Sequence, residues 1–366
     1  MSMTPRERIL AVLNGEEPDK IPVACLGSMP GFEFCPEIAL ERLKKRGLSI
    51  LRMSSIYTPV WSVLSGRDPG LPDVKYTGTE YVENGILKQR QTYKTPAGNI
   101  TCVIIANPID NVALSRTPQE YLVKQPSDWR VVNYITRAIL DNLAPMYQHF
   151  QREEEGLGDE GIAYIILGIT AWQNAWITLA GPERAIIDFH QQPDEVQEYI
   201  DLDRRWHTRL AEFAADCPAK YLVIQENMSD MTSPRYYREY CLPIYEIYAK
   251  HLHGTGKVLG AHMDGPLGKL KKEIAESPIN VIDSLSVPPT GDVSLTEVRE
   301  IWPDKMVFMN TAAHLSWAEP AKVREFYKAL AEEWGSKKGL LLELCEHLPL
   351  ETVEAHMSAA LDAFGY

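Results

Sequence analysis

Residues 221–264, YLVIQENMSDMTSPRYYREYCLPIYEIYAKHLHGTGKVLGAHMD, contain a complete strand–helix–strand unit. Two apolar runs in this stretch turn polar at Glu226 and at His262, where the predicted strands end. Between them, Ser233-Pro234 indicates a helix start, because serine caps a helix and proline fits its first turn. Apolar runs without alternation are typical of strands that are buried on both faces of a parallel sheet.

The same alternation of strand and helix extends over most of the chain. Two strands are expected before residue 74 and six after residue 127, with helices between them. Eight such units predict an α/β protein built as a single (β/α)8 TIM barrel. No linker rich in Gly, Ser or Pro separates two halves, so we expect one domain over residues 1–366. The expected strands are 21–25, 49–53, 162–169, 221–226, 257–262, 280–287, 306–310 and 340–345.

Several helix starts are marked by capping residues. The tetrapeptide TPRE at 4–7 joins a capping box to a proline in the first turn, which predicts an N-terminal helical extension. A second capping box at 294–297 predicts another helix, and Ser127 is expected to cap a long helix that ends near Phe150. Pro243 lies inside a predicted helix and is expected to bend it, because proline leaves backbone carbonyls unpaired.

Residues from about 74 to 107 interrupt the alternation. This excursion is polar, and its two runs of strand-forming residues, 88–93 and 100–105, flank a Pro/Gly turn at 95–99. The pattern predicts an antiparallel β-hairpin inserted into the barrel.

Composition excludes several classes of protein. Lys and Arg total 37 against 50 Asp and Glu, and a net charge of −13 argues against nucleic acid or an anionic membrane as partner. No run of about 18 apolar residues is present, so no membrane-spanning helix is expected. The start MSMTPRERIL lacks the pattern of a signal peptide, and the six cysteines form no C-x-x-C. We therefore expect a cytoplasmic protein without a disulfide framework.

Chemistry is expected where the strands end, because the carboxyl ends of barrel strands form the mouth of the active site. Glu226, His262, Asp264 and Cys345 all follow apolar runs and should meet there. Cys241 begins the helix after a rim strand and can also face the mouth. A mixed Glu, Cys and His set favours zinc, with Glu226, Cys241 and His262 as ligands and Asp264 or Cys345 as alternatives. Each residue also has an ordinary structural role open to it, as a salt-bridge partner, a hydrogen-bonded histidine or a buried thiol.

Other residues near the strand ends are candidates for contact with a substrate. Asp264 shares a strand face with His262 and is a catalytic candidate, because it can orient a metal ligand or the substrate. Asn310 and His314 are further catalytic candidates, which are expected to hydrogen-bond a substituent of the substrate. The candidate substrate-binding residues are Tyr57, Trp61, Trp172, Trp176 and Asp283, although ordinary core packing stays open for the aromatic side chains.

The opening TPRERILAVLNGEEPDKIPV at 4–23 resembles the start of uroporphyrinogen decarboxylase superfamily proteins. This resemblance spans nearly the whole chain, and it implies a (β/α)8 barrel. The further matching segments, in order, are TPAGNIT at 95–101, LAGPER at 179–184, QPDEV at 192–196, SPRYYREYCLP at 233–243, GAHMDG at 260–265 and VPPTGDVS at 287–294.

The superfamily divides by chemistry, and local segments indicate the branch. True decarboxylases carry an R-Q-A-G-R-type segment for substrate carboxylates, and the corresponding segment here, LGSMPGFEF at 26–34, has no arginine. Thiol-methylating corrinoid enzymes carry H-x-C and a later Cys, whereas this chain has His262-Met-Asp264. The O-demethylase methyltransferases resemble E-x14-E-x20-H, and Glu226 and His262 fit this spacing, with Cys241 at the middle position.

The O-demethylase resemblance implies a zinc-dependent methyltransferase. Such an enzyme moves a methyl group from a small methoxylated, in the simplest case aromatic, substrate to the cob(I)alamin of a separate corrinoid protein. The chain lacks a D-x-H-x-x-G corrinoid signature, so the cobalamin is expected on the partner. A homodimer is a possible assembly. The alternatives are a metal-free decarboxylase with Asp264 or Asp283 at the substrate, a thiol-directed cobalamin methyltransferase, and a non-catalytic corrinoid- or tetrapyrrole-binding protein.

Overall fold

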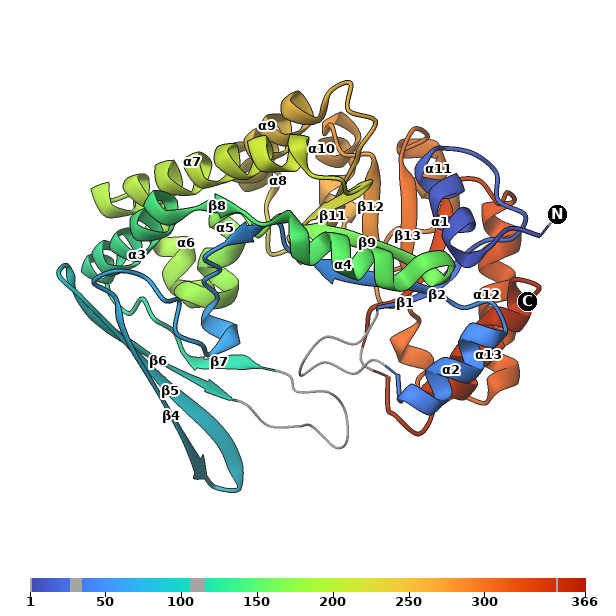
Figure 1. Cartoon of the computed structure of the whole chain (residues 1–366), viewed down its shortest axis with the longest axis horizontal. Coiled ribbons are helices and arrows are strands. Elements are labelled where there is room, and N and C mark those ends of the chain that lie inside the picture. The colour runs from blue at the N-terminus through green and yellow to red at the C-terminus, as the bar shows by residue number, and fades with distance from the viewer. Residues whose placement is uncertain (1, 27–34, 106–115, 347) are drawn as a thin grey trace.

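Eight parallel strands close into a barrel, as predicted (Figure 1). The computed structural model describes residues 2–26, 35–105, 116–346 and 348–366. Around the barrel the strand order is β1-β14-β13-β12-β11-β10-β9-β2, and neighbouring strands pair in parallel. The strands are β1 (Val23–Leu26), β2 (Ser49–Ser54), β9 (Gly161–Ile166), β10 (Tyr221–Ile224), β11 (Val258–His262), β12 (Val281–Leu285), β13 (Met306–Asn310) and β14 (Leu340–Leu344).

The barrel strands are apolar because both of their faces are covered. Every residue of β10 and β14 is buried, which explains the unbroken runs YLVI and LLLEL. Inside the barrel, Tyr221 packs on Tyr164 and Phe308, with ring centroids 5.6 and 5.0 Å apart. The interior is therefore filled by side chains rather than open as a pore.

Helices follow the strands and cover the outside of the barrel (Figure 1). Among them, the predicted capping boxes are present at the starts of α1 and α11. The helices are α1 (Pro5–Leu13), α2 (Glu37–Lys45), α3 (Trp129–Asn142), α4 (Tyr147–Leu157), α5 (Ala171–Asn174), α6 (Gly181–Gln191), α7 (Asp194–Asp216), α8 (Pro234–Tyr236), α9 (Leu242–Leu252), α10 (Lys271–Glu276), α11 (Leu295–Ile301), α12 (Pro320–Trp334) and α13 (Val353–Ala363).

The prediction of one long helix from Ser127 to Phe150 is wrong. This segment forms two helices, α3 and α4, which are separated by the short strand β8 (Ala144–Pro145). Pro145 disfavours a helical conformation at the residue before it and cannot continue the backbone hydrogen-bond ladder. The strand pairs instead with β3 (Tyr57–Thr58), which lies beyond the end of β2.

The predicted hairpin is confirmed but belongs to a larger sheet. β5 (Ile86–Thr95) and β6 (Gly98–Ile105) pair in antiparallel fashion across the Pro/Gly turn. They are flanked by β4 (Lys75–Glu83) and β7 (Thr117–Glu120), in the order β4-β5-β6-β7. This sheet extends away from the barrel at the lower left of Figure 1. In the outer strand β4, polar and apolar residues alternate only weakly, and almost all of them are exposed. Its sequence therefore gives little indication of a strand.

The helix between β10 and β11 is interrupted, as Pro243 predicted. After α8, one π-helical turn, η5 (Tyr237–Cys241), precedes α9. Pro243 is the second residue of α9, directly after the π-turn, and because proline has no N–H it cannot bond to the carbonyls of the preceding turn. Single π-turns of this kind occur frequently at functional sites, and this one ends at Cys241.

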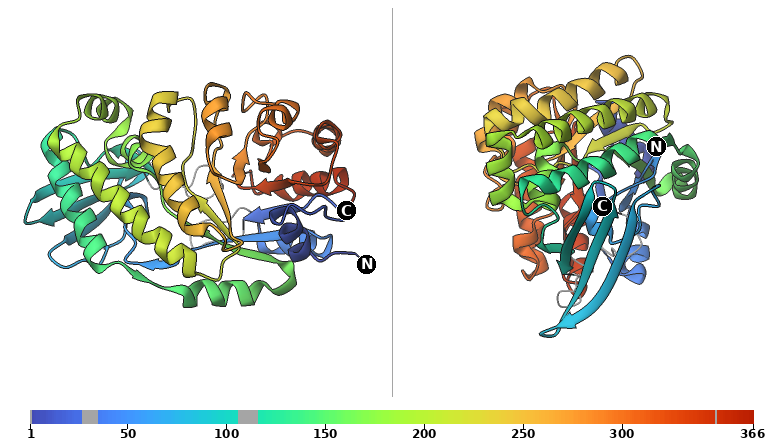
Figure 2. Two further views of the ribbon diagram at one scale, coloured as in Figure 1. Left: turned by 90° about the horizontal axis from the view of Figure 1, so that it is seen from above. Right: turned by 90° about the vertical axis from the view of Figure 1, so that its left-hand side faces the viewer.

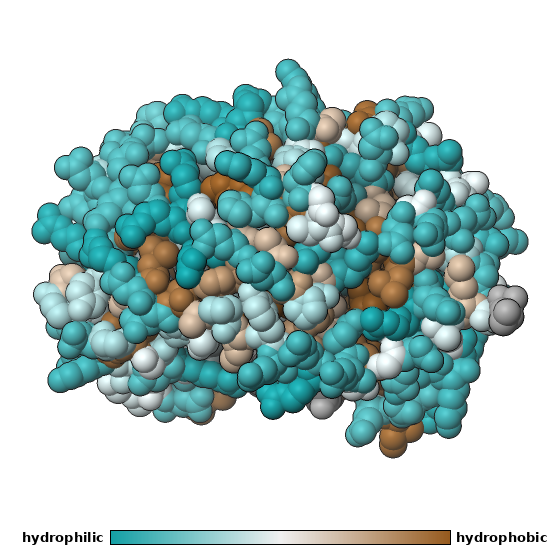
Figure 3. Space-filling view, turned by 45° about the horizontal axis from the view of Figure 1, so that its top comes forward, coloured by the Kyte–Doolittle hydropathy of each residue, from teal (hydrophilic) through white to brown (hydrophobic). Residues whose placement is uncertain are grey.

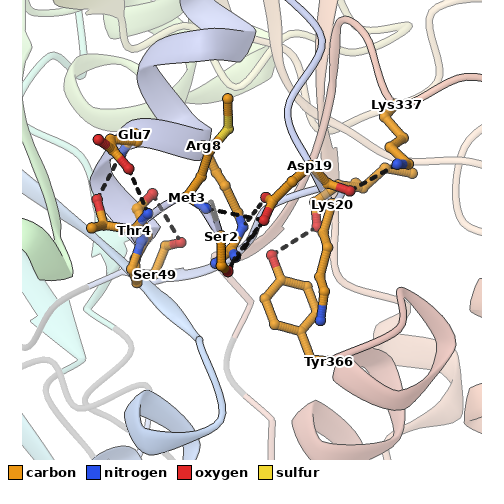
Figure 4. A network of polar contacts seen from close by, with 12 residues as sticks. Ser2, Met3, Thr4, Glu7, Arg8, Asp19, Lys20, Ser49, Lys337 and Tyr366 are labelled. Atoms are coloured by element: carbon orange, nitrogen blue, oxygen red, sulfur yellow. Dashed lines mark hydrogen bonds and ion pairs between the residues drawn. The ribbon is translucent and has the colours of Figure 1, made fainter.

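The two ends of the chain meet at Asp19. Figure 4 shows Arg8 of α1 donating to Asp19 from Nε at 2.6 Å and from Nη2 at 3.1 Å. Lys337 donates to the Asp19 carbonyl at 2.8 Å, and the Tyr366 hydroxyl donates to Ile21 O at 3.1 Å. Both termini consequently lie on the same side of the molecule (Figure 2).

The surface is largely hydrophilic, with hydrophobic residues exposed in separate patches on the face in Figure 3. No helix in the described part of the chain is long and apolar enough to cross a membrane.

Replacing Asp19 by Asn should destabilise the fold. The Arg8 side chain is only 6% exposed, so the variant leaves its charge buried without a counterion, and we expect a loss of about 1–2 kcal/mol at pH 7. The hydrogen bond from Arg8 lowers the pKa of Asp19 to about 2, so its stabilisation is present above pH 4 and is lost as the pH falls toward 2. Thermal unfolding at pH 7 and pH 3 measures this. If the variant were less stable than the wild type by the same amount at both pH values, the assignment of the Arg8–Asp19 ion pair as the source of this stability would be contradicted.

Replacing Gly161 by Ala should disrupt the closure of the barrel between β2 and β9. A Cβ at Gly161 would stand 1.8 Å from the Ile50 carbonyl oxygen, and backbone cannot move away cheaply. We expect a loss of about 2 kcal/mol or more in unfolding free energy. Gly156→Ala in α4 is the matched control, because nothing lies within 4 Å of its Cβ and alanine favours the helix. Equal urea midpoints for the two variants would contradict this packing.

Candidate active site at the barrel rim

Glu226 and Cys241 both contact Thr170 at the carboxyl end of the barrel. Glu226 follows β10 by two residues, and its side chain is fully buried. The Thr170 hydroxyl, which follows β9, donates to Glu226 Oε2 at 2.8 Å and lies 3.6 Å from Cys241 Sγ. Thr170 thus joins the carboxylate to the thiol.

Burial dominates the electrostatics of this pair. It raises the pKa of Glu226 to about 7, although the hydrogen bond from Thr170 offsets part of the shift. Burial and the nearby Glu226 also raise the pKa of the Cys241 thiol well above its usual value. Glu226 Oε1 has no well-aligned hydrogen bond, and the Tyr245 hydroxyl, which also has none, lies close enough to the Glu226 carboxylate to interact with it. Such atoms are costly to leave unpaired, so the pocket has unused capacity to bind a polar or charged group.

His262 belongs to a second set of polar residues on β11 and β12. Its Nδ1 lies 2.8 Å from Asp283 Oδ1, and its Nε2 lies 3.7 Å from Asp264 Oδ2. Tyr221 of β10 donates to the other oxygen of Asp283 at 2.7 Å. Burial lowers the pKa of His262, but Asp264 and Asp283 outweigh it and hold this pKa well above its ordinary value. Asp283, predicted as a substrate-binding residue, lies against His262 and Tyr221.

The residues fit a metal in part. Glu226 offers a buried carboxylate oxygen that has no well-aligned hydrogen bond, and Thr170 links this carboxylate to the Cys241 thiol, so the two side chains are a suitable pair of zinc donors. His262, the third predicted ligand, is directed to Asp283 instead. Within the described residues, no group of three His, Cys, Asp or Glu side chains is placed to hold a metal ion.

Cys345, the alternative thiolate ligand, lies in a third cluster at the ends of β12, β13 and β14. Its thiol lies 2.9 Å from the Ser284 hydroxyl and donates to Asn310 Oδ1 at 3.0 Å. Asn310 in turn donates to Glu346 at 2.9 Å, so this predicted catalytic residue has protein partners on both sides. His314 is exposed at the rim and packs edge-on against Phe326.

Glu343 is a buried acid that sequence reasoning did not select. It is 1% exposed in the middle of β14, and Ser284, a residue at φ +59° in a bulge of β12, donates to it at 3.5 Å. Burial and the neighbouring Asp283 raise the pKa of Glu343 well above its usual range. A lone glutamate inside the apolar run LLLEL was the available signal, since such a residue is rarely buried without a purpose.

A cavity of about 540 Å³ opens beside Glu226. Gln225 and Asn227, on either side of Glu226, line it, and so do two predicted substrate-binding residues, Tyr57 and Trp61. The remaining walls come from α3, α7 and the segment after β9.

The other two aromatic candidates lie outside this cavity. Trp172 is fully buried; its Nε1 donates to Thr232 at 3.1 Å and its ring packs on Phe189. Trp176 is half-buried, and its Nε1 donates to Gln173 at 2.7 Å. Both indoles therefore already have partners within the protein.

Asp203 of α7 is a further residue of the cavity wall that the sequence did not reveal. Its carboxylate accepts from the backbone N–H of Ala171 at 3.1 Å, next to Thr170. Burial raises the pKa of Asp203 well above its usual range, and Glu226 adds to the shift. Asp203 sits in the amphipathic helix at 194–216, where a charged residue on the inner face was the only available signal.

Comparison with known proteins places this architecture in a family. A model of the family described as uroporphyrinogen decarboxylase (URO-D) matches residues 159–365. A solved methyltransferase from Methanosarcina mazei has a similar fold, with a TM-score of 0.57 and 15% identity over 100% of both chains. No curated protein matches the chain. Because the family model covers more than half of its length, the chain belongs to the uroporphyrinogen decarboxylase (URO-D) family.

Proposed function

We propose that this protein is a zinc-dependent methyltransferase that transfers a methyl group from a small methoxylated molecule to the cob(I)alamin of a separate corrinoid protein. The observation that carries the proposal is the fully buried Glu226 carboxylate, which shares the Thr170 hydroxyl with the Cys241 thiol and has one oxygen without a well-aligned hydrogen bond. The family and the methyltransferase fold of a solved neighbour support it. We place the reaction in the cytoplasm.

Glu226, Cys241 and His262 would hold the zinc, as the O-demethylase spacing implies. Thr170 fixes the Glu226 carboxylate by its hydrogen bond to Oε2, and the π-turn η5 presents Cys241 to it. Asp283 holds the ring of His262 by the contact to Nδ1 and leaves Nε2 toward Asp264.

The chain's own residues prepare a water-poor site for the transfer. When bound, zinc supplies a Lewis acid that stabilises the negative charge on the departing oxygen. The partner's Co(I) would supply the electron pair for the new bond to the methyl carbon, and the electron pair of the broken carbon–oxygen bond would stay on oxygen. Glu226 and Cys241 are fully buried, so bulk water does not compete at this position.

A decarboxylase of the uroporphyrinogen type is the second candidate. The observation that favours it is the group of Asp283, His262 and Asp264, in which two carboxylates lie beside one imidazole. Decarboxylation that persists after removal of all metal by chelation would support this candidate over the first.

The metal proposal predicts about one zinc per chain in the purified protein. Glu226→Gln, Cys241→Ser and His262→Ala should each lower the zinc affinity by about tenfold or more, because each removes a ligand. Metal analysis after dialysis against a competing chelator measures this. Absence of zinc from the wild-type protein would contradict the proposal.

Two serine variants separate the thiol candidates. Cys217→Ser is the matched control, because this buried thiol donates to the Ala214 carbonyl of α7, and its loss should leave the zinc content unchanged. Cys345→Ser should also retain zinc. If Cys345→Ser lost zinc while Cys241→Ser retained it, the zinc ligands would instead be His262, Asp264 and Cys345.

The reaction itself is tested with cob(I)alamin, whose methylation changes its absorption spectrum. Methoxylated aromatics should give methylcobalamin with zinc-loaded wild-type protein, and about a hundredfold less with Cys241→Ser. Equal rates for the two proteins would contradict a role of this thiol in the reaction.

A further inference from the structure

The cavity beside Glu226 has the size and lining of a small-molecule site. Its volume of about 540 Å³ lies within the range of ligand pockets, and most of its wall is apolar. Four aromatic residues contribute to this wall: Tyr57, Trp61, Tyr199 and Trp206. Tyr57 and Trp206 are in edge-to-face contact, with ring centroids 5.6 Å apart, so these walls are fixed by each other.

The aromatic wall is also held by the backbone. Gly168, at φ +88°, lines the cavity at the end of β9, and a Cβ there would stand 2.3 Å from the Trp206 ring. Only glycine lets the indole approach the strand so closely. The cavity is therefore built into the fold rather than left by loose packing.

Polar side chains line the cavity in several places, including Thr136 and Asn174. Asp203, Gln225 and Asn227 also line it and lie next to the Glu226 and Thr170 pair. A ring in the cavity would contact the aromatic wall, while its oxygen substituents would meet these polar side chains on the side of Glu226.

The wall carries no positive charge. None of the described residues that line the cavity is a lysine, arginine or histidine. His207 lies behind Asp203, with Nε2 3.7 Å from Oδ1, but burial lowers its pKa to about 3 and keeps it neutral. Arg116, near the same end of the molecule, donates to Gln89 and does not line the cavity.

An anionic ligand would consequently enter without a counterion. Burial of a carboxylate in such a wall costs several kcal/mol when no cation or set of donors compensates it. Asp203, in the wall, is an acid and cannot act as a counterion for a carboxylate. The described lining likewise offers no counterion to the many carboxylates of a porphyrinogen.

We propose that this cavity binds the ring of an uncharged methoxylated aromatic substrate and discriminates against its carboxylated analogues. The inference rests on the proposed function, because it names the substrate class of that reaction, but binding to the cavity can be measured without any methyl transfer.

The test compares two ligands of nearly the same shape, 1,2-dimethoxybenzene and 3,4-dimethoxybenzoate, by titration calorimetry with the zinc-loaded protein. We expect the neutral compound to bind at least about tenfold more tightly, which corresponds to about 1.4 kcal/mol. Equal affinities, tighter binding of the benzoate, or no binding of either compound would overturn the proposal. Tighter binding of tetramethylammonium than of the neutral ring would also overturn the proposal, because it would show that the aromatic wall and Asp203 form a binding site for a cation.

A charge introduced into the wall should reverse the preference. Thr136 of α3 lines the cavity and its hydroxyl donates to the carbonyl four residues earlier, Val132 O, at 2.9 Å. Thr136→Lys should strengthen benzoate binding about tenfold or more, because it provides the missing counterion. Thr208→Lys is the matched control: Thr208 of α7 makes the same bond to Arg204 O at 2.8 Å, is also half-buried and does not line the cavity. Equal effects of both variants would overturn the assignment of the cavity.

Failure of this inference differs from failure of the proposed function. If the neutral ring binds with the expected preference but no methylcobalamin forms with it, the cavity assignment stands and the methyltransferase proposal fails. If methylcobalamin forms equally fast from both ligands, the reaction stands and the cavity is not its substrate pocket.

Discussion

The parallel pairing of β10 with β11 decides which side chains reach the rim together. Ile224 lies opposite Ala261, so the polar residues that follow each strand emerge at the same level of the barrel. Glu226 lies just beyond one strand, and His262 ends the other. A shift of this register by a single residue would turn these side chains to opposite faces, because side chains alternate along a strand. The proposed zinc site depends on this pairing.

The second constraint is the interruption of the helix that follows β10. Pro243 fits only the first turn of a helix, so the preceding residues adopt a π-turn that ends at Cys241. This turn brings the thiol to Thr170, and Thr170 joins it to Glu226. In a regular α-helix, the Cys241 side chain would point in a different direction around the helix axis. Sequence spacing alone could therefore suggest the thiol as a ligand, but the turn explains how it reaches the carboxylate.

The barrel was predictable because its information is local. Apolar runs such as YLVI, capping boxes at 4–7 and 294–297, and the Pro/Gly turn at 95–99 each specify one element. The errors arose where tertiary pairing decides the outcome. Pro145 divides a long helical pattern because β8 pairs with β3, and exposed β4 joins the sheet only through its contact with β5.

The site was predictable only in outline. Strand ends identified Glu226, His262 and Asp283, but the contact between the last two, and the separation of His262 from Cys241, depend on side-chain directions that no spacing specifies. Glu343 and Asp203 were not selected, because each is a single acid in an otherwise ordinary pattern. The cavity also escaped prediction, since α3, α7 and β3, which form its walls, are far apart in sequence.

The most direct test of the central claim is an anomalous difference map, measured at the zinc absorption edge on crystals of the zinc-loaded protein. The account predicts a single strong peak between Glu226 and Cys241, with the His262 ring as the third ligand. A peak at Cys345 and Asp264, or no peak at the barrel rim in zinc-loaded crystals, would contradict it.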